Sequence, residues 1–166
     1  MTGPSEQRRG YFELVFRPSV ELVSIVRRFV ADSFGELLED DEATSRLALA
    51  THELLENAVK YCVNGEARLS VELRGDGASR RVIVTTGNAA SEPNRRAAER
   101  CLDALAGAAD PFQYYQALLR RSRNAQGSGL GLARVRAEAD MTMTHHAEGD
   151  HISIRAEASV TPGAAA

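Results

Sequence analysis

Apolar positions recur at two spacings along the chain, and these spacings predict where its helices and strands lie. A step of three or four residues, typical of a helix, runs through VELVSIVRRFVADSFGELL and again through the stretch that follows the acidic run EDDE. Alternation with polar residues, typical of a half-buried strand, marks RLSVEL, and YFELVF has a strand-like composition. The predicted order is a strand over 11–16, a helix over 20–38, a helix from 39–42 to about 63, a hairpin of strands over 69–73 and from 82, helical segments between 91 and 124, a helix over 130–139, and strands over 141–146 and 152–158.

Capping and turn residues agree with these limits. Ser19 is a candidate N-cap for the first helix, and Asn64–Gly65 is a stop signal for the second. Asp110–Pro111 predicts a new helix start after a break near Gly107, with proline at the first helical position. Because the strands pair in hairpins with helices between them, we expect an α+β fold. It is a two-layer α/β sandwich with a mixed, mainly antiparallel sheet and helices on one face.

Length and composition narrow the class of protein. At 166 residues, 43% of them hydrophobic and 26% charged, the chain is typical of one globular domain with a proper core. We expect that domain over 11–158, between a flexible N-terminus over 1–10 and a flexible tail over 159–166. A net charge of −3 argues against direct nucleic-acid binding, because general nucleic-acid binders are usually basic.

The cellular location is indicated by apolar runs and by cysteines. No apolar run reaches the length of a membrane span, and MTGPSEQRRG lacks the hydrophobic segment of a signal peptide. Cys62 and Cys101 both stand in helical patterns, so we expect free thiols. The expectation is a cytoplasmic protein that makes no membrane contact.

The stretch AQGSGLGLARVRA places three glycines at alternate positions directly before a helical pattern. Gly127, Gly129 and Gly131 cost conformational entropy, so close approach or unusual dihedral angles should require them. A helix start also presents unpaired N–H groups and the positive end of the helix dipole, which together suit a phosphate group. The alternative is a glycine-rich turn before a helix.

A second informative stretch is THELLENAVKYC, in the second predicted helix. Glu53, Asn57 and Lys60 are spaced so that they form one polar stripe beside the apolar one. A carboxylate and an amide oxygen placed in this way can hold a hydrated magnesium ion and orient an attacking hydroxyl, since magnesium needs only one or two protein oxygens beside nucleotide phosphates. The alternative is a solvated face on which Glu56 and Lys60 form an ordinary pair.

Other motifs fit less well. The glycine run lacks the Lys-Ser/Thr of a Walker A loop, and its spacing is not GxGxxG. The run HHAEGDH holds metal-ligand residue types, but adjacent strand residues point to opposite faces, so a polar hairpin tip explains it better. Cys62 and His52 are ten residues apart, about 15 Å along a helix, which excludes a Cys–His dyad there.

Taken together, HELLENAVKY and GSGLGLARV resemble the two motifs of the GHKL (histidine-kinase-like, Bergerat) ATP-binding superfamily. Residues 53–61 look like its N-box and residues 127–132 like its second glycine box. The resemblance covers about residues 11–158. The short, stand-alone chain resembles the anti-sigma and partner-switching serine kinases of this superfamily, and its long lid resembles their SiaB-like branch.

The resemblance implies a role for each matched position. Glu53 would be the general base or orienting carboxylate, Asn57 would bind Mg²⁺, and Lys60 and Tyr61 would line the nucleotide side of the helix. Backbone N–H groups of the glycine box would meet the ATP phosphates. They belong to Gly127, Gly129, Leu130 and Gly131.

The resemblance also implies an ATP lid over about 88–126. The basic end of this lid, RRSR, holds three arginines that would reach phosphate or would form a solvated helix end. They are Arg120, Arg121 and Arg123.

The first glycine box departs from the superfamily pattern. By position Thr85 stands where the adenine-binding aspartate belongs, Gly87 matches the first glycine, and Ala89 replaces the second. A threonine hydroxyl accepts a hydrogen bond more weakly than a carboxylate, which costs about 1–3 kcal/mol, or roughly 5- to 150-fold in affinity. Asn88 is a candidate for partial compensation.

Two functions follow from this comparison. The first is an ATP- and Mg²⁺-dependent serine/threonine kinase or anti-sigma factor that acts on a small antagonist protein, with a sigma factor and a second copy of the chain as further partners. The alternative is a degenerate domain that binds a partner protein without catalysis. Thr85 favours the alternative, whereas the intact pair of Glu53 and Asn57 favours the kinase. A plain ATPase would lack a second domain to use the hydrolysis.

Overall fold

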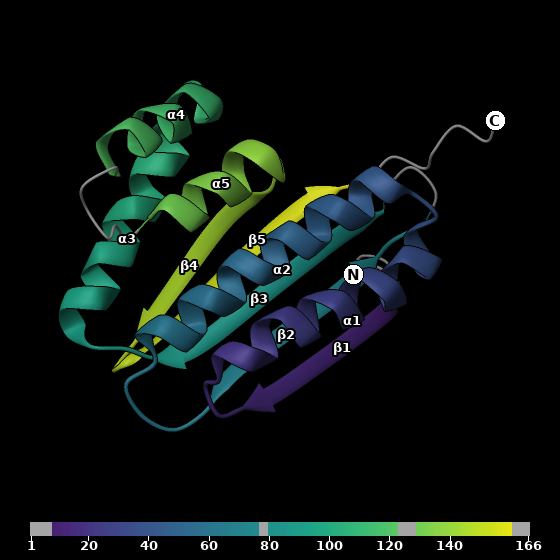
Figure 1. Cartoon of the computed structure of the whole chain (residues 1–166), viewed down its shortest axis with the longest axis horizontal. Coiled ribbons are helices and arrows are strands. Elements are labelled where there is room, and N and C mark those ends of the chain that lie inside the picture. Colours follow the sequence, from purple (N-terminus) through teal and green to yellow (C-terminus); the bar gives the residue numbers. More distant parts are fainter. Residues whose placement is uncertain (1–7, 77–79, 123–128, 161–166) are drawn as a thin grey trace, which may run out of the picture.

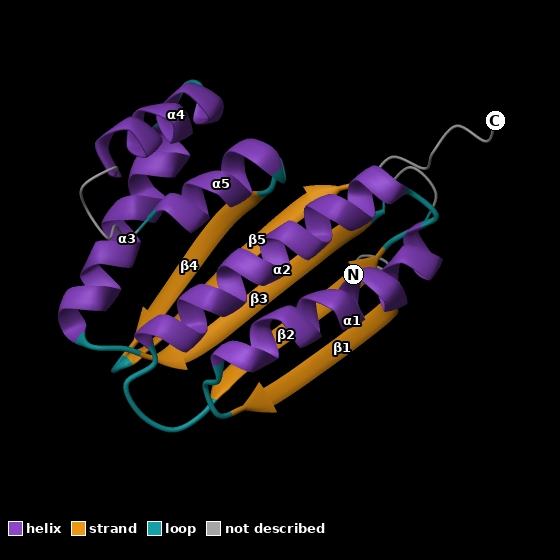
Figure 2. Ribbon diagram, viewed as in Figure 1, coloured by secondary structure: helices purple, strands orange, loops and turns teal. Residues whose placement is uncertain are grey.

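A five-stranded antiparallel sheet forms one layer of the protein, and helices cover one of its faces (Figures 1 and 2). The computed structural model describes residues 8–76, 80–122 and 129–160. The sheet order is β1-β2-β3-β5-β4. The strands are β1 (Arg8–Phe16), β2 (Ala67–Arg74), β3 (Arg81–Ala89), β4 (Thr142–Glu148) and β5 (His151–Ser159). The helices are α1 (Val20–Leu38), α2 (Asp41–Tyr61), α3 (Glu92–Gly107), α4 (Pro111–Arg121) and α5 (Leu130–Glu138).

The predicted α+β sandwich is confirmed, and every neighbouring pair of strands is antiparallel. The predicted elements are all present, and the differences lie at their ends. The first strand begins earlier than predicted, at Arg8, and β3 continues to Ala89 because it pairs with β5 as far as that residue, beyond its last pair with β2 at Gly87. At the other end of the chain Val160 is buried and its N–H bonds to the carbonyl of Arg80.

Side-chain caps stand at the starts of three helices, and at α3 the hydroxyl of Ser91 accepts from the N–H of Asn94 at 3.4 Å. Asp40 accepts a hydrogen bond from the N–H of Ala43 at 2.9 Å and so starts α2. Asp110 accepts from two backbone N–H groups, each at 3.0 Å, and so starts α4 immediately before Pro111. Ser19 occupies the N-cap position of α1, but its hydroxyl donates to Glu21 and makes no cap hydrogen bond.

The core lies between the sheet and the helices. On α2 the predicted apolar stripe is buried at Leu47, Ala50, Leu54 and Ala58, which face β2 and β3. Figure 1 shows α2 along the middle of the sheet with α1 beside it, while α3, α4 and α5 gather at the β4 side of the sheet. Within the described parts of the chain, none of the helices combines the length and apolarity that a bilayer span requires.

Candidate functional site

Helix α2 presents the predicted polar stripe with exposure that increases along it. Glu53 is 8% exposed, Asn57 is half-buried and Lys60 is exposed. Because the stripe lies beside the core-facing residues, its first member sits at the edge of the core and its last member reaches the surface. Glu53 and Asn57 therefore lie one turn apart on the same side of the helix, as the spacing predicts.

The solvated-face alternative applies to the outer edge of this stripe. Glu56 is exposed, and its Oε2 lies 3.9 Å from Nε2 of His52, one turn earlier. Nζ of Lys60 lies 5.2 Å from the centre of the Tyr61 ring, within cation–π distance. The helix is thus solvated at Glu56 and buried at Glu53.

The pleat of β3 decides which of its polar residues face α2. Val84, Thr86 and Asn88 alternate on the inner face, where Thr86 is 3% and Asn88 6% exposed. Thr85 and Gly87 alternate on the outer face and line a separate hollow there. The structure therefore brings Thr86 and Asn88 to Asn57, and it places Thr85 and Gly87 on the opposite side of the sheet.

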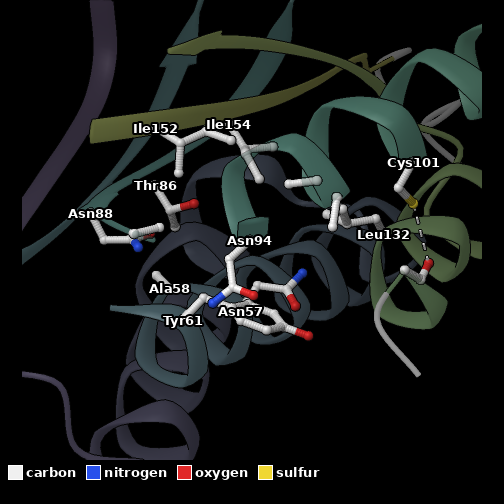
Figure 3. A pocket seen from close by; sticks show the side chains of 14 residues that line it. Asn57, Ala58, Tyr61, Thr86, Asn88, Asn94, Cys101, Leu132, Ile152 and Ile154 are labelled. Atoms are coloured by element: carbon white, nitrogen blue, oxygen red, sulfur yellow. Dashed lines mark hydrogen bonds between the residues drawn. The ribbon is translucent and has the colours of Figure 1, made fainter. Parts of the chain in front are cut away.

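A largely apolar hollow lies between α2, α3 and the inner face of the sheet (Figure 3). Its cavity volume is about 100 Å³, against roughly 10–15 Å³ for one water molecule on this measure. Figure 3 shows amide and hydroxyl groups on one side of the hollow and aliphatic side chains on the other. The labelled lining residues are Asn57, Ala58, Tyr61, Thr86, Asn88, Asn94, Cys101, Leu132, Ile152 and Ile154.

A second, more polar hollow adjoins the first. The two hollows share the lining residues Asn57, Tyr61 and Gly129, so they lie next to each other. The second has a cavity volume of about 280 Å³. Its further lining residues are Glu53, Glu56, Lys60, Tyr115, Leu130, Gly131 and Arg134. The region thus has an apolar end suited to a flat ring and a polar end suited to charged groups.

The predicted glycine segment stands at the start of α5, where the two hollows meet. Gly129 is the N-cap, with a φ of 97° that favours glycine, and a Cβ there would lie 2.8 Å from Sγ of Cys101. Leu130 and Gly131 follow in the first turn, where N–H groups lack partners within the helix. Gly127 lies outside the described residues. The described residues of the glycine segment therefore form a helix N-terminus that faces the polar hollow.

Glu53 contacts α5 through both of its carboxylate oxygens. Nη1 of Arg134 donates to Oε1 at 3.0 Å. A Cβ on Gly131 would lie 2.5 Å from Oε2, so a larger residue there would require the carboxylate or the helix to shift. Nε of Arg134 donates at 2.8 Å to Glu138, one turn further along α5. The candidate base is thus an ion-paired carboxylate.

Two groups around this ion pair have raised pKa values. The hydrogen bond to Glu138 raises the pKa of Arg134, and the Glu53 carboxylate adds to the effect. Burial raises the pKa of the Tyr115 hydroxyl, and the charge of Glu138 adds to it. Both shifts favour one arrangement at neutral pH, a charged guanidinium beside two carboxylates and a neutral phenol.

Helices α3 and α4 occupy most of the predicted lid. Asn94 and Cys101 of α3 line the apolar hollow, and Tyr115 of α4 lines the polar one. Burial raises the pKa of Cys101. Arg120 and Arg121 are exposed at the end of α4, as the solvated-end alternative predicts, and Arg123 lies outside the described residues.

The HHAEGDH run forms the β4–β5 hairpin, and its histidines point to different sides. His145 Nε2 lies 3.2 Å from Asp103 on α3. His146 lies 3.8 Å from Glu148, and His151 lies 2.7 Å from Asp150. Each histidine thus has its own acidic neighbour.

Sequence reasoning missed four residues that the structure adds to the site: Thr86, Asn94, Tyr115 and Arg134. Alternation from Val84 would have predicted Thr86 on the inner face. The contact of Arg134 with Glu53 joins residues 81 positions apart, and no local pattern signals it.

Comparison with known proteins gives a likeness of structure and none of sequence. No protein-family model matches the chain, and no curated protein sequence matches it significantly. A chain in the crystal structure of the SiaB–SiaC complex from Pseudomonas aeruginosa superposes with a TM-score of 0.66 over 92% of both chains. The two sequences are 14% identical, so this likeness shows a shared fold.

Proposed function

We propose that this protein binds ATP with Mg²⁺ and transfers its γ-phosphoryl group to a serine or threonine of a small partner protein. The observation that carries the proposal is the pair of adjoining hollows, with Asn57 at their junction, Glu53 in the polar part and the start of α5 facing both. A flat base suits the apolar part, and phosphates suit the helix N-terminus. The similar chain in the SiaB–SiaC complex supports a protein partner.

The donor atoms present suit a shared magnesium site. Among the described residues no group of three or more His, Cys, Asp or Glu could hold a metal ion by itself. Mg²⁺ usually takes one or two protein oxygens and completes its shell with water and phosphate oxygens, so the amide oxygen of Asn57 fits this role. When bound, the ion would neutralise charge on the phosphates.

The residues of the chain would then act as follows. Glu53 would accept the proton of the acceptor hydroxyl as the acceptor oxygen bonds to the γ-phosphorus. The bond from that phosphorus to the β,γ-bridging oxygen would break, and ADP would leave. N–H groups of Leu130 and Gly131 would offset charge on the transferring group. Lys60, at the rim of the polar hollow, would add a positive charge.

Recognition of the adenine ring would use Thr86 and Asn88 in place of a carboxylate. Asn88 donates through Nδ2 to the carbonyl of Ala89 at 3.0 Å, which fixes its side-chain amide at the hollow. The hydroxyl of Thr86 and the amide of Asn88 supply neutral acceptors for an exocyclic amine. We therefore expect weaker adenine binding than an aspartate would give, by roughly 5- to 150-fold.

Calorimetric titration with ATP and ADP, each with and without Mg²⁺, tests nucleotide binding. Magnesium-dependent binding should be lost in Asn57→Ala and kept in Asn64→Ala, which alters an exposed asparagine beyond α2. Thr86→Ala should weaken binding, whereas Thr85→Ala, one residue away on the outer face, should not. The reverse result for the two threonines would favour the assignment made from the glycine-box position. No binding at millimolar nucleotide would reject the proposal.

Transfer needs a second assay. Proteins captured on the immobilised chain are supplied with ATP labelled at the γ-phosphate. The wild-type chain should label a captured protein, and Glu53→Gln should capture the same protein without labelling it. If Glu53→Gln labels as well as the wild type, Glu53 is not the base.

Two observations favour the alternative function, a domain that binds a partner protein without catalysis. Arg134 holds Glu53 in an ion pair. Thr86 and Asn88, the residues proposed to recognise adenine, are neutral. Under this alternative the captured protein stays unlabelled with every variant, and its capture does not depend on Asn57.

A further inference from the structure

The ion pair of Arg134 with Glu53 joins two helices at the centre of the candidate site. Nη1 of Arg134 lies 3.0 Å from Oε1 of Glu53, and Nε lies 2.8 Å from Oε2 of Glu138. Because Glu138 is one turn away on the same helix, α5 itself fixes the direction of the guanidinium. Glu138 therefore holds the guanidinium of Arg134 through Nε, while Nη1 contacts the carboxylate of Glu53 on α2.

Burial makes the Glu53 carboxylate depend on its ion pair with Arg134. Its side chain is 9% exposed, whereas that of Arg134 is 43% exposed and remains partly hydrated. A carboxylate so removed from water is costly unless it is paired, so removing the arginine would leave Glu53 uncompensated. Tyr115, 8% exposed, lines the same hollow from α4. Gly131 lets α5 approach the carboxylate.

We infer that Arg134 is a positioning residue, which holds the Glu53 carboxylate in place for the acceptor hydroxyl. The inference rests on the proposed function, because it assigns Arg134 a part in that transfer. Oε1 carries the ion pair, which leaves Oε2, on the side of Gly131, to accept the proton. A fixed carboxylate keeps its orientation when the acceptor arrives, and precise orientation accounts for much of the rate of such steps.

A direct phosphate-binding role for Arg134 is less consistent with the geometry. Its Nε and Nη1 donate to two carboxylates, and both contacts would weaken if the guanidinium moved to a phosphate. Lys60 and the start of α5 line the same hollow and are the better candidates for the phosphates. The two roles differ in what they predict for nucleotide affinity.

The experiment measures transfer rate and nucleotide affinity separately. Arg134→Met should lower kcat by about 10- to 100-fold, the loss usual when the partner that orients a metal ligand is removed. The Kd for ATP should stay within about threefold of the wild-type value. Arg134→Lys should recover part of kcat, because a lysine restores the charge without the fixed planar fork. Equal losses of affinity and rate would overturn the inference and favour phosphate binding.

Two further variants separate positioning from a structural effect. Arg136→Met is the matched control, since Arg136 lies on the same helix and pairs with Asp140 at 3.3 Å near the surface; it should leave kcat unchanged. In a Glu53→Gln background, Arg134→Met should cause no further loss, because the group it positions has been replaced. A further loss there, or an unchanged kcat in Arg134→Met alone, would overturn the inference.

A measurement without nucleotide separates this inference from the proposed function. The changes in thermal unfolding for Arg134→Met and Glu53→Gln should not add in the double variant, because the residues are in contact. Additive changes would show that Arg134 does not hold Glu53. If the changes are not additive but the wild-type chain binds no ATP, the ion pair stands, and both the proposed function and the positioning role fail.

Discussion

Gly131→Ala tests directly whether the start of α5 lies against the candidate base. An alanine Cβ would sit 2.5 Å from Oε2 of Glu53 and 3.5 Å from its Cδ, so either the carboxylate or the helix must move. Arg134 holds Oε1, and moving the carboxylate would therefore strain that ion pair. Overpacking of this kind costs about 1–3 kcal/mol, while alanine in place of a helical glycine gains up to about 1 kcal/mol.

Gly107→Ala supplies the matched control, because a Cβ on that glycine at the end of α3 meets nothing within 4 Å. It should be neutral or stabilising. The difference between the two variants should be about 1–3 kcal/mol, which for a chain of this length is roughly 2–12 °C in Tm. Differential scanning calorimetry of both proteins at one pH measures this difference.

A double variant should reverse the direction of the change in stability. In a Glu53→Ala background the clash is gone, so adding Gly131→Ala should be neutral or stabilising, like Gly107→Ala. If Gly131→Ala already stabilises the otherwise unchanged chain as much as Gly107→Ala does, the carboxylate does not lie on α5. That result would also remove the geometric basis for the positioning role of Arg134.

Three further predictions concern the frame around the site. Leu54→Ala should lower the free energy of unfolding by about 2–5 kcal/mol in urea titrations, since Leu54 is fully buried on α2; a loss under 1 kcal/mol would contradict the packing. Asp110→Ala should cost about 0.5–2 kcal/mol, because two backbone N–H groups of α4 lose their acceptor; an unchanged midpoint would show that the cap is not formed. Burial raises the pKa of Cys101, so its contribution to stability is complete below the unfolded thiol pKa of about 8.5 and is lost as pH rises through the higher folded value. Titrations from pH 8 upward should show a loss that Cys101→Ser lacks, and equal slopes would contradict it.

The fold was largely predictable because its patterns are local. Helix α2 shows an apolar stripe, an acidic start and an Asn-Gly stop within one stretch, and α4 has Asp110–Pro111 at its start. The ends of strands were less predictable. β3 extends to Ala89 because β5 supplies pairing partners as far as that residue, and β5 comes from a distant part of the chain.

The site residues on the single helix α2 could be predicted from the sequence. Those that other elements bring to α2 could not. Glu53 and Asn57 share α2, so their spacing sufficed. Counting from the glycine box pointed to Thr85, whereas the pleat that buries Val84 turns Thr86 toward Asn57. Arg134 joins the site only because α5 packs on α2, which is a property of the packed domain.

The position of Lys60 has a practical consequence for chemical labelling. It is the single lysine in the sequence, and it stands exposed in the last turn of α2 beside Tyr61, at the rim of the polar hollow. Apart from the α-amino group, an amine-reactive fluorophore would therefore attach to one side chain, beside the region where a ligand would enter. The same chemistry gives a footprint, because a molecule seated in the hollow would slow acylation of that amine. The chain thus carries a built-in attachment point for following occupancy of the hollow without any engineered residue.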